Sequence, residues 1–368
     1  MSVGYCESEY EAAMLDLLSS LGWEQSCGDD LHRMYSEALI VDDLRAYFQQ
    51  HYPDFTADEL ERVIFNLRNT GAATDYLSLR AVASLCVDGF DFNRDDPTLP
   101  KQHVAYIDFE NPESNIFRAV NQFTFAERGI ERRPDVLLFV NGIPLCIIEL
   151  KNPAQRQATI FNAWEQIHVR YKRDIPSLMK FCMLSCISDG GTTRLGTTYA
   201  PFEHYYAWKK VENEEKASTG LGEMQALVKG AFAPSRFLEL VRDFVYFPDV
   251  QEGQQRETEI ICRYPQFFAV KKLYSSILAH LREHGGDGKG GTYFGATGCG
   301  KTFTMLFLAR CLIKRTTLSP TILIIVDRED LETQSGKLFE SSTDFLGDDS
   351  IRSFDSREDL RNLCTKGG

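Results

Sequence analysis

The sequence lacks close cysteine pairs. Its ten cysteines are spread singly over 368 residues, and none forms a Cys-x-x-Cys pair. A four-ligand zinc site is therefore not expected. Cys182 and Cys186 lie four residues apart in an apolar stretch, where we expect them to be small buried side chains. Unpaired thiols in this number are typical of a reducing compartment, so the sequence predicts a cytoplasmic protein.

A long hydrophobic run is also missing. The most apolar stretch, 136–150, is interrupted by Asn141, Gly142 and Pro144 and is too short to span a bilayer. The first eleven residues have neither a basic start nor an apolar segment, so no signal peptide is expected. These absences predict a soluble protein that has no membrane partner.

Basic residues are outnumbered by acidic ones. The net charge is -13 and the pI is about 5.1. This balance argues against a protein that coats DNA without specificity. It is compatible with an enzyme that meets DNA in one local cleft, or that leaves most DNA contacts to a partner subunit. The length of 368 residues suits two or three domains.

Hydrophobic patterning predicts an α/β fold in the first half of the chain. Asn141-Gly142 separates two apolar segments, 136–140 and 145–150, which is typical of a β-hairpin. Both arms are apolar on both faces, so we expect them in the middle of a covered sheet. The other expected elements are helices at 9–21, 39–68, 158–171 and 224–247, and strands at 102–110, 122–126 and 181–187.

Three ionisable residues bracket this hairpin. Asp135 precedes the first arm, and Glu149 and Lys151 end the second. The two ends of a hairpin are neighbours in space, and residues two apart on a strand share a face, so the three side chains can converge. Two carboxylates bind Mg²⁺ through oxygen, and an adjacent lysine can position a water for attack on a phosphodiester. The motif by itself leaves a surface ion pair between Glu149 and Lys151 equally open.

A second motif carries a different chemistry. The sequence Gly-Ala-Thr-Gly-Cys-Gly-Lys-Thr at 295–302 fits the phosphate-loop pattern GxxxxGK[ST], in which backbone N–H groups surround the phosphates of ATP. The lysine reaches the β- and γ-phosphates and the threonine hydroxyl ligates Mg²⁺. The segments 292–294 and 321–326 are expected to be strands of a parallel nucleotide-binding sheet. The nucleotide-binding residues predicted here are Gly295, Gly298, Gly300, Lys301 and Thr302.

The stretch from Arg132-Arg-Pro-Asp135 to Glu149-Leu-Lys-Asn-Pro153 closely resembles the nuclease core of the motor and endonuclease (R) subunit of type I restriction enzymes. Segments 121–123, 173–178 and 187–190 share this resemblance, which continues through the phosphate loop over nearly the whole chain. The resemblance implies a PD-(D/E)xK nuclease fold, with a mixed sheet flanked by helices. It assigns Asp135, Glu149 and Lys151 as the catalytic set, with Mg²⁺ held by the two carboxylates.

Further positions follow from the same resemblance. Nucleases of this fold often carry a glutamate on the first helix, and Glu11 matches by position as a Mg²⁺ ligand, although an exposed helix charge is equally compatible. The family also has Gln-x-x-x-Tyr on the helix after the lysine, and Gln166 matches the glutamine as a catalytic residue. The next tyrosine, Tyr171, lies one residue too far along. On an α-helix this turns its side chain about 100° away from the expected face.

Two segments beside the phosphate loop resemble motifs of superfamily-two helicases. Residues 263–270 resemble the glutamine motif, in which Gln266 would read the adenine edge. Residues 326–334 resemble the next helicase motif, which contacts the DNA backbone. The resemblance implies a RecA-like helicase lobe that is incomplete in this sequence. The candidate residues of the second motif are Asp327, Arg328 and Gln334.

These features predict a nuclease domain at 1–215, a helical connector at 216–258 and part of a first RecA-like lobe at 259–368. The resemblance implies a type I site-specific deoxyribonuclease, which cleaves double-stranded DNA with Mg²⁺ and couples cleavage to ATP-driven translocation in the full-length subunit. Its partners would be methylase and specificity subunits. Two alternatives stay open at this point: an ATP-independent nuclease like a Holliday-junction resolvase, and a non-cleaving module that docks the methylase and specificity subunits.

Overall fold

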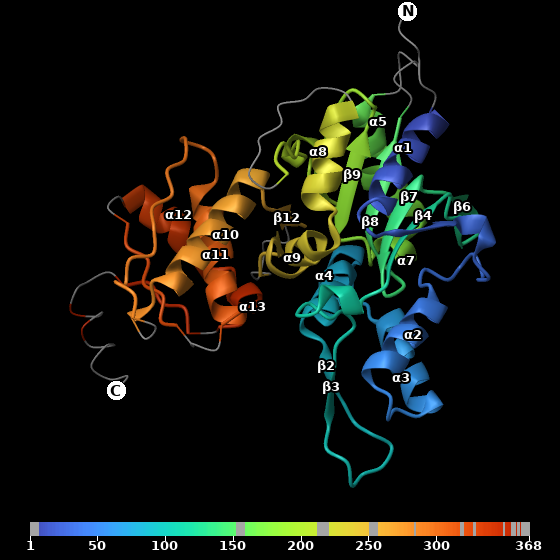
Figure 1. The fold of residues 1–368 in the computed structure, drawn as a ribbon, viewed down its shortest axis with the longest axis horizontal. Helices are drawn as coiled ribbons and strands as arrows, with labels where there is room; N and C mark the ends of the chain where they lie inside the picture. The colour runs from blue at the N-terminus through green and yellow to red at the C-terminus, as the bar shows by residue number, and fades with distance from the viewer. Residues whose placement is uncertain are drawn as a thin grey trace, which may run out of the picture. The chain divides into compact units, whose positions relative to one another are not determined.

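The chain divides into two compact units (Figure 1). The first comprises Met1–Val245 with Glu259–Tyr264, and the second comprises Tyr246–Thr258 with Pro265–Gly368. The computed structural model describes residues 7–151, 159–211, 221–249, 257–282, 285–316, 320–326, 329–348, 350–354, 358 and 361. Within these ranges, no helix is both long enough and apolar enough to cross a membrane.

A six-stranded mixed sheet forms the centre of the first unit (Figure 1). The β1–β4 and β8–β9 pairs are parallel, and the other neighbours are antiparallel. The predicted mixed α/β sheet is confirmed. In spatial order its strands are β1 (Glu24–Cys27), β4 (Phe117–Asn121), β7 (Val136–Val140), β8 (Ile143–Leu150), β9 (Leu184–Ser188) and β10 (Thr193–Thr197).

The hairpin of β7 and β8 lies in the middle of this sheet, as predicted, and every residue of both strands is buried. Asn141 and Gly142 both have positive φ, at 50° and 79°, which matches the right-handed twist of the strands that they join. The register shifts between Leu138 and Phe139, which marks a β-bulge. Burial on both faces explains why the two arms are continuous apolar runs rather than alternating ones.

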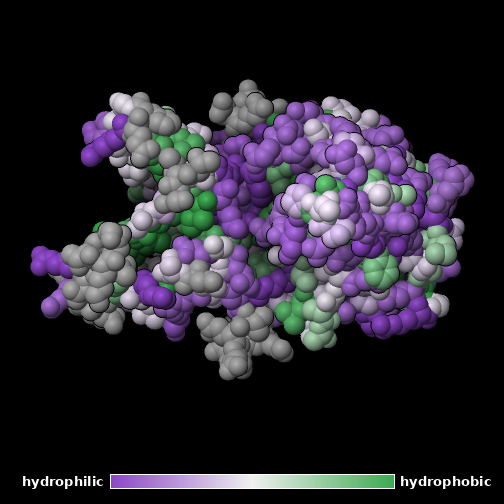
Figure 2. Space-filling model, turned by 90° about the horizontal axis from the view of Figure 1, so that it is seen from below, coloured by the Kyte–Doolittle hydropathy of each residue, from purple (hydrophilic) through white to green (hydrophobic). Residues whose placement is uncertain are grey.

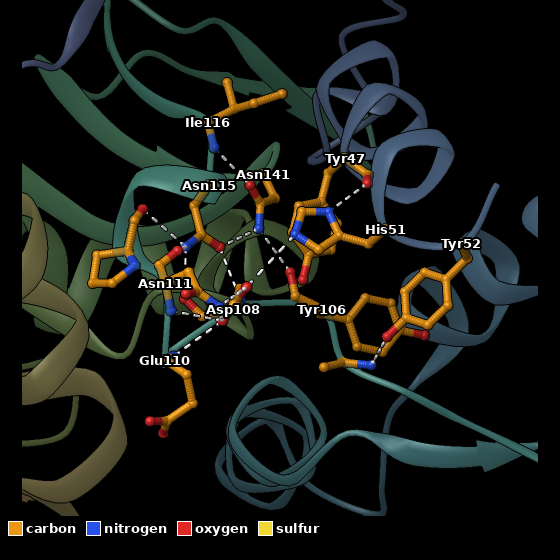
Figure 3. Close-up of polar contacts among 12 residues, drawn as sticks. Tyr47, His51, Tyr52, Tyr106, Asp108, Glu110, Asn111, Asn115, Ile116 and Asn141 are labelled. Carbon is orange, nitrogen blue, oxygen red and sulfur yellow. Dashed lines mark hydrogen bonds and ion pairs between the residues drawn. The ribbon is translucent and has the colours of Figure 1, made fainter.

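A buried polar network anchors the turn of this hairpin (Figure 3). The Asn141 side chain donates to the Tyr106 carbonyl (2.9 Å) and to Asn115 Oδ1 (2.8 Å), and accepts from the Ile116 amide (2.8 Å). Asn115 in turn accepts from the Asp108 amide at 2.9 Å. Because Asn141 is fully buried, these bonds meet the polar groups that burial would otherwise leave unsatisfied. They fix the turn of the hairpin, and a different set of polar residues lies at its open end.

Two predicted strands are shorter than expected and lie outside the main sheet. The segment 102–110 forms only β3 (Gln102–Val104), which pairs with β2 (Phe90–Phe92). The segment 122–126 contributes to β5 (Phe125–Glu127), which pairs with β6 (Ile130–Arg132). The sheet strands β1, β4 and β10 were not predicted. They are short and carry little alternation, so their strand character comes from pairing with neighbours.

The helical region expected at 39–68 is two helices, α2 (Val41–His51) and α3 (Ala57–Asn69). A capping box divides them: the Thr56 side chain accepts from the Glu59 amide, and the Glu59 carboxylate accepts from the Thr56 amide. The other helices of this unit are α1 (Glu7–Ser19), α4 (Asp75–Asp88), α5 (Ile160–Glu165), α6 (Lys172–Asp174), α7 (Pro176–Met179), α8 (Leu221–Ala231) and α9 (Pro234–Asp243). A short β11 (Val245–Tyr246) pairs with β12 (Ile260–Ile261).

The described part of the second unit is helical. Its helices are α10 (Tyr264–Ala279), α11 (Lys301–Lys314), α12 (Glu329–Glu340) and α13 (Thr343–Leu346). The strands predicted at 292–294 and 321–326 are not formed, and that prediction is wrong for the structure. A parallel strand exists only through hydrogen bonds to a neighbour, and neither segment pairs with another among the described residues. Accordingly, Phe294 and Ile325 are 95% and 82% exposed.

Hydrophobic residues also reach the surface on the face seen in Figure 2, in patches among mostly hydrophilic neighbours. The largest exposed apolar side chains of the first unit include Met34 and Phe65, which lie on different elements. Single exposed apolar residues of this kind are normal for a folded surface.

Candidate functional site

The open end of the β7–β8 hairpin brings Asp135, Glu149 and Lys151 together. The Leu150 amide donates to Asp135 Oδ2 at 2.7 Å, so the first carboxylate lies on the backbone between the other two residues. Lys151 Nζ donates to Glu149 Oε1 at 2.7 Å and to the Leu150 carbonyl at 3.1 Å. The Lys151 amide donates to the Ser188 carbonyl, which holds this strand end against β9. Two carboxylates and one ammonium group therefore lie together at the ends of the central strands β7 and β8.

The environment of Glu149 is unusual for a carboxylate. Its side chain is only 1% exposed. Its pKa is raised to about 8, mainly by burial and secondly by the nearby charge of Asp135, while Lys151 and Tyr171 act in the opposite direction. A surface ion pair would leave the pKa of a carboxylate low, so the geometry does not match that alternative. A buried carboxylate, Glu149, beside a second and partly exposed one, Asp135, is an arrangement whose repulsion an added cation would relieve.

The prediction that Tyr171 faces away from this site is wrong. Residues Gln166–Tyr171 form a π-helical turn, in which one more residue fits into the turn than in an α-helix. The extra residue is absorbed there, and the Tyr171 hydroxyl donates to Glu149 Oε2 at 3.1 Å. Gln166 Nε2 donates to the same hydroxyl oxygen at 2.6 Å. Gln166 and Tyr171 therefore reach Glu149 as a connected pair.

Glu11 lies near the beginning of β7. Its Oε1 accepts from Asn121 Nδ2 at 2.7 Å, and its Oε2 accepts from Gln122 Nε2 at 2.6 Å. The Gln122 amide donates to the Asp135 carbonyl at 3.0 Å, which connects Glu11 to the site through one residue. Within the described ranges, no three His, Cys, Asp or Glu side chains are grouped so that they could hold a metal ion. Both Glu11 oxygens thus have amide donors, and its role as a Mg²⁺ ligand stays a prediction.

Sequence reasoning missed the amides of Asn121 and Gln122 as partners of Glu11. Gln122 has a φ of 53°, which few residues other than glycine adopt. This backbone turn directs its side chain to α1. A hydrophobic pattern does not predict a positive φ at a glutamine, although residues 121–123 are one of the segments that carry the family resemblance.

The phosphate-loop residues lie in the second unit. Lys301 begins α11, and its Nζ donates to the carbonyls of Gly295 (3.0 Å) and Ala296 (3.1 Å), so its ammonium folds back onto the loop. Gln266 is buried and donates from Nε2 to the Gly300 carbonyl at 2.9 Å. Gly298 and Gly300 have positive φ, and Thr302 is the second residue of the helix. The structure therefore brings the predicted glutamine and the phosphate loop together.

The three candidate side chains of the helicase motif at 326–334 lie outside the part of the chain that the structure describes. Asp327 and Arg328 lie outside the described residues, and the side chain of Gln334 does as well. Their predicted contact with the DNA backbone stays a prediction.

Two protein-family models match the chain. The model for the type I restriction enzyme R protein N terminus matches residues 4–204, and the model for the SWI2/SNF2 ATPase matches residues 265–368. The first match contains the hairpin site, and the second contains the phosphate loop and Gln266.

Curated relatives agree with these matches. The type I restriction enzyme HindI endonuclease subunit of Haemophilus influenzae is 30% identical over 373 residues, which cover 98% of this chain and 35% of that protein. The putative type I restriction enzyme MjaIXP endonuclease subunit of Methanocaldococcus jannaschii is 26% identical over 360 residues, 90% of this chain and 34% of that protein. A Staphylococcus aureus type I restriction enzyme endonuclease subunit, SauMSSORF170P, is 23% identical over 347 residues, which cover 90% of this chain and 33% of that protein.

The chain thus spans about a third of the length of the curated relatives that it matches. The family-model match covers more than half of the chain, including the converging residues of the β7–β8 hairpin. The chain belongs to the family of type I restriction enzyme R (endonuclease) subunits, with the N-terminal region of that family followed by part of a SWI2/SNF2 ATPase.

Proposed function

We propose that this chain supplies the DNA-cleaving site, and the first part of the motor, of an ATP-dependent type I restriction endonuclease. The reaction would be Mg²⁺-dependent endonucleolytic cleavage of double-stranded DNA, coupled to translocation in the full-length subunit. The observation that carries this proposal is the meeting of the buried Glu149 with the partly exposed Asp135 and Lys151 at the open end of a central hairpin. The endonuclease names of the relatives support it.

The donor set fits a magnesium ion. Asp135 and Glu149 offer hard carboxylate oxygens, and the pKa of Glu149 is raised by burial first and by the repulsion from Asp135 second. Mg²⁺ is commonly held by one or two carboxylates together with waters and substrate phosphate oxygens, so a third protein carboxylate is not required. When bound, the ion would stabilise charge on the scissile phosphate and lower the pKa of a coordinated water.

The protein's own residues would prepare the site for this ion. The Leu150 amide orients Asp135, and the Tyr171 hydroxyl orients Glu149. Burial raises the pKa of Tyr171, so its hydroxyl stays protonated and continues to donate. The Lys151 ammonium lies 2.7 Å from Glu149 Oε1, where it can orient an attacking water and offset phosphate charge. We propose Asp135, Glu149 and Lys151 as catalytic residues, with Gln166 acting through Tyr171.

We propose ATP as the ligand of the phosphate loop. The match of 265–368 to an ATPase family supports this, as does the donation from Gln266 to the loop carbonyl at Gly300. Lys301 would exchange its two carbonyl partners for the β- and γ-phosphates, and Thr302 would hold Mg²⁺. A RecA-like lobe is the corresponding fold, since the loop leads directly into α11.

The proposed domain organisation is a nuclease domain at 1–215, a connector at 216–258 and a motor lobe from 259. Helices α8 and α9, which lie within the connector, belong to the same compact unit as the sheet up to Val245. As partners we propose double-stranded DNA and the methylase and specificity subunits of a restriction-modification complex, on the strength of the relatives' identity as type I restriction subunits.

The test is cleavage of circular duplex DNA by the full-length subunit with its partner subunits, ATP and Mg²⁺. Glu149→Ala and Lys151→Ala are expected to lower the cleavage rate by at least about a hundredfold while ATP hydrolysis continues. Arg62→Gln, which removes an exposed ion pair to Asp95, is the matched control and should cut like the wild type. If Glu149→Ala and Lys151→Ala cut like the wild type, the site assignment is wrong.

The same assay separates the two other functions. Cleavage that needs Mg²⁺ but is unaffected by Lys301→Ala would indicate an ATP-independent, resolvase-like nuclease. A stable complex with the partner subunits, together with no cation binding at Asp135 or Glu149, would indicate a docking module.

A further inference from the structure

The π-helical turn before Tyr171 requires an explanation. An α-helix has about 3.6 residues per turn, and a π-turn is a rare departure from it that tertiary contacts must support. In an ordinary α-helix the residue after the turn would rotate by about 100°. The Tyr171 hydroxyl would then leave Glu149, from which it is 3.1 Å away. Within the turn, His168 Nδ1 lies 3.2 Å from the Thr198 carbonyl oxygen, and a contact beyond the turn can also help select the observed register.

An ion pair with a buried carboxylate and a partly exposed guanidinium lies directly after this turn. Arg132 donates from Nε (2.8 Å) and from Nη2 (2.6 Å) to Asp174 Oδ2. The Asp174 side chain is 2% exposed and that of Arg132 is 36% exposed. Arg173 also donates to the Asp174 carboxylate, at 2.6 Å to Oδ1, but it lies on the same helix and connects nothing else. Of the contacts to Asp174, the one that joins two separate parts of the chain is therefore the one from Arg132. Lys172 of the same helix makes a second long-range contact, 3.4 Å from the centre of the Tyr199 ring.

The two ends of this pair sit beside the candidate site in the sequence. Arg132 ends β6 and precedes Asp135 by three residues. Asp174 ends α6 and follows Tyr171 by three residues. Residues three apart on a helix lie on one side of it, so Asp174 and Tyr171 would rotate away together if the π-turn became α-helical. The same change of register would break the bond to Arg132 and the bond to Glu149.

We propose that the ion pair between Arg132 and Asp174 is a positioning device that fixes the register of the Gln166–Tyr171 turn and so keeps the Tyr171 hydroxyl on Glu149. This inference rests on the proposed nuclease function. Asp174 and Arg132 touch neither metal nor substrate in this account. They act through Tyr171, as supporting residues around metal sites commonly do.

The test uses the full-length subunit with its partners and measures cleavage of circular duplex DNA at saturating ATP. Asp174→Asn and Arg132→Gln are each expected to lower cleavage about 10- to 100-fold, the usual effect of removing a supporting contact at a metal site. The double variant should be no worse than either single one, because both remove the same contact. ATP hydrolysis, which reports on the second unit, should be unchanged, and Arg62→Gln should again match the wild type.

A deletion distinguishes positioning from general stabilisation. Val169 lies in the π-turn and is 46% exposed. Deleting it shortens the spacing from Gln166 to Tyr171 to four residues, which an α-helix brings to one face without further support. The deletion should therefore cut within a few-fold of the wild type, and it should restore most of the activity of Asp174→Asn.

Either of two results would overturn the inference: Asp174→Asn cutting at the wild-type rate, or a loss that the Val169 deletion does not reverse. Asp135→Ala runs in parallel and separates this failure from failure of the function itself. If Asp135→Ala also cuts normally, the proposed nuclease site is wrong. If only Asp135→Ala is inactive, the site stands and the positioning role of Asp174 falls.

Discussion

At the scale of single residues, Glu149 shows why the sequence motif alone could not distinguish a catalytic site from a surface ion pair. Asp135, Glu149 and Lys151 fit a catalytic set and a surface ion pair equally well as text. The structure contains the ion pair between Lys151 Nζ and Glu149 Oε1, at 2.7 Å, but the Glu149 side chain is only 1% exposed. The same contact that would be trivial at the surface is costly when buried, because a charged carboxyl loses its water. Burial, which no three-residue pattern encodes, excludes a surface ion pair and supports the proposed catalytic set.

The raised pKa of Glu149 predicts a loss of stability that depends on pH. Between the ordinary pKa of 4.5 and about 8, the folded protein keeps a proton that the unfolded chain releases. The free energy of unfolding of the metal-free protein should therefore fall as pH rises through this window. Glu149→Gln removes the titrating group and should stabilise the protein above that window by up to about 5 kcal/mol, while abolishing cleavage.

Denaturant unfolding of the two proteins in a chelator, at about pH 5 and about pH 9, measures this difference. The gap between variant and wild type should widen with pH, and added Mg²⁺ should narrow it again. A gap that is the same at both pH values would contradict the assigned environment of Glu149.

The elements could be predicted from the sequence where their determinants are local. Asn141-Gly142 marked the hairpin because a two-residue turn with two positive φ angles demands such residues. The strand β4 was missed because it is held by neighbours on both sides rather than by its own pattern. Tyr171 was misplaced because a regular α-helix was assumed, whereas a tertiary contact can select a π-turn.

The turn of the hairpin yields a prediction for stability. A Cβ at Gly142 would lie 2.1 Å from the Ile40 carbonyl oxygen, on a backbone with φ 79°. Gly142→Ala should therefore destabilise the protein by about 3 kcal/mol or more. Alanine would be strained at this positive φ, and the backbone would also have to shift to remove the clash with Ile40. Gly129 has the same φ of 79° but nothing within 4 Å of such a Cβ.

Gly129→Ala is the matched control for this substitution and should cost only about 1 kcal/mol from backbone strain. Thermal or denaturant unfolding of both variants gives the comparison. Equal losses would mean that the close approach of the turn to Ile40 is not a constraint on the fold.

At the scale of the whole molecule, the chain carries its two candidate sites in two compact units. The acidic net charge of -13 excluded DNA coating but could not locate a site. The phosphate loop was recognisable because its residues are contiguous. The sheet expected around it was not formed among the described residues, because parallel strands depend on partners that a local pattern cannot supply.

Two sites in separate units predict separable ligand effects. ATP with Mg²⁺ should raise the melting temperature of the chain, since a ligand at a hundred times its Kd stabilises by about 2.7 kcal/mol. Lys301→Ala should lose this shift but retain the response to a divalent cation alone. Asp135→Ala should show the reverse. A variant that loses both responses would contradict the assignment of the two ligands to independent residues.

The most direct test of the nuclease site is to locate a bound cation. Crystals of the protein soaked in Mn²⁺, which replaces Mg²⁺ and scatters anomalously, are predicted to show a peak at the carboxylates of Asp135 and Glu149. The peak should vanish in Asp135→Ala. Mn²⁺ bound only elsewhere, in a protein that cleaves DNA, would contradict the account.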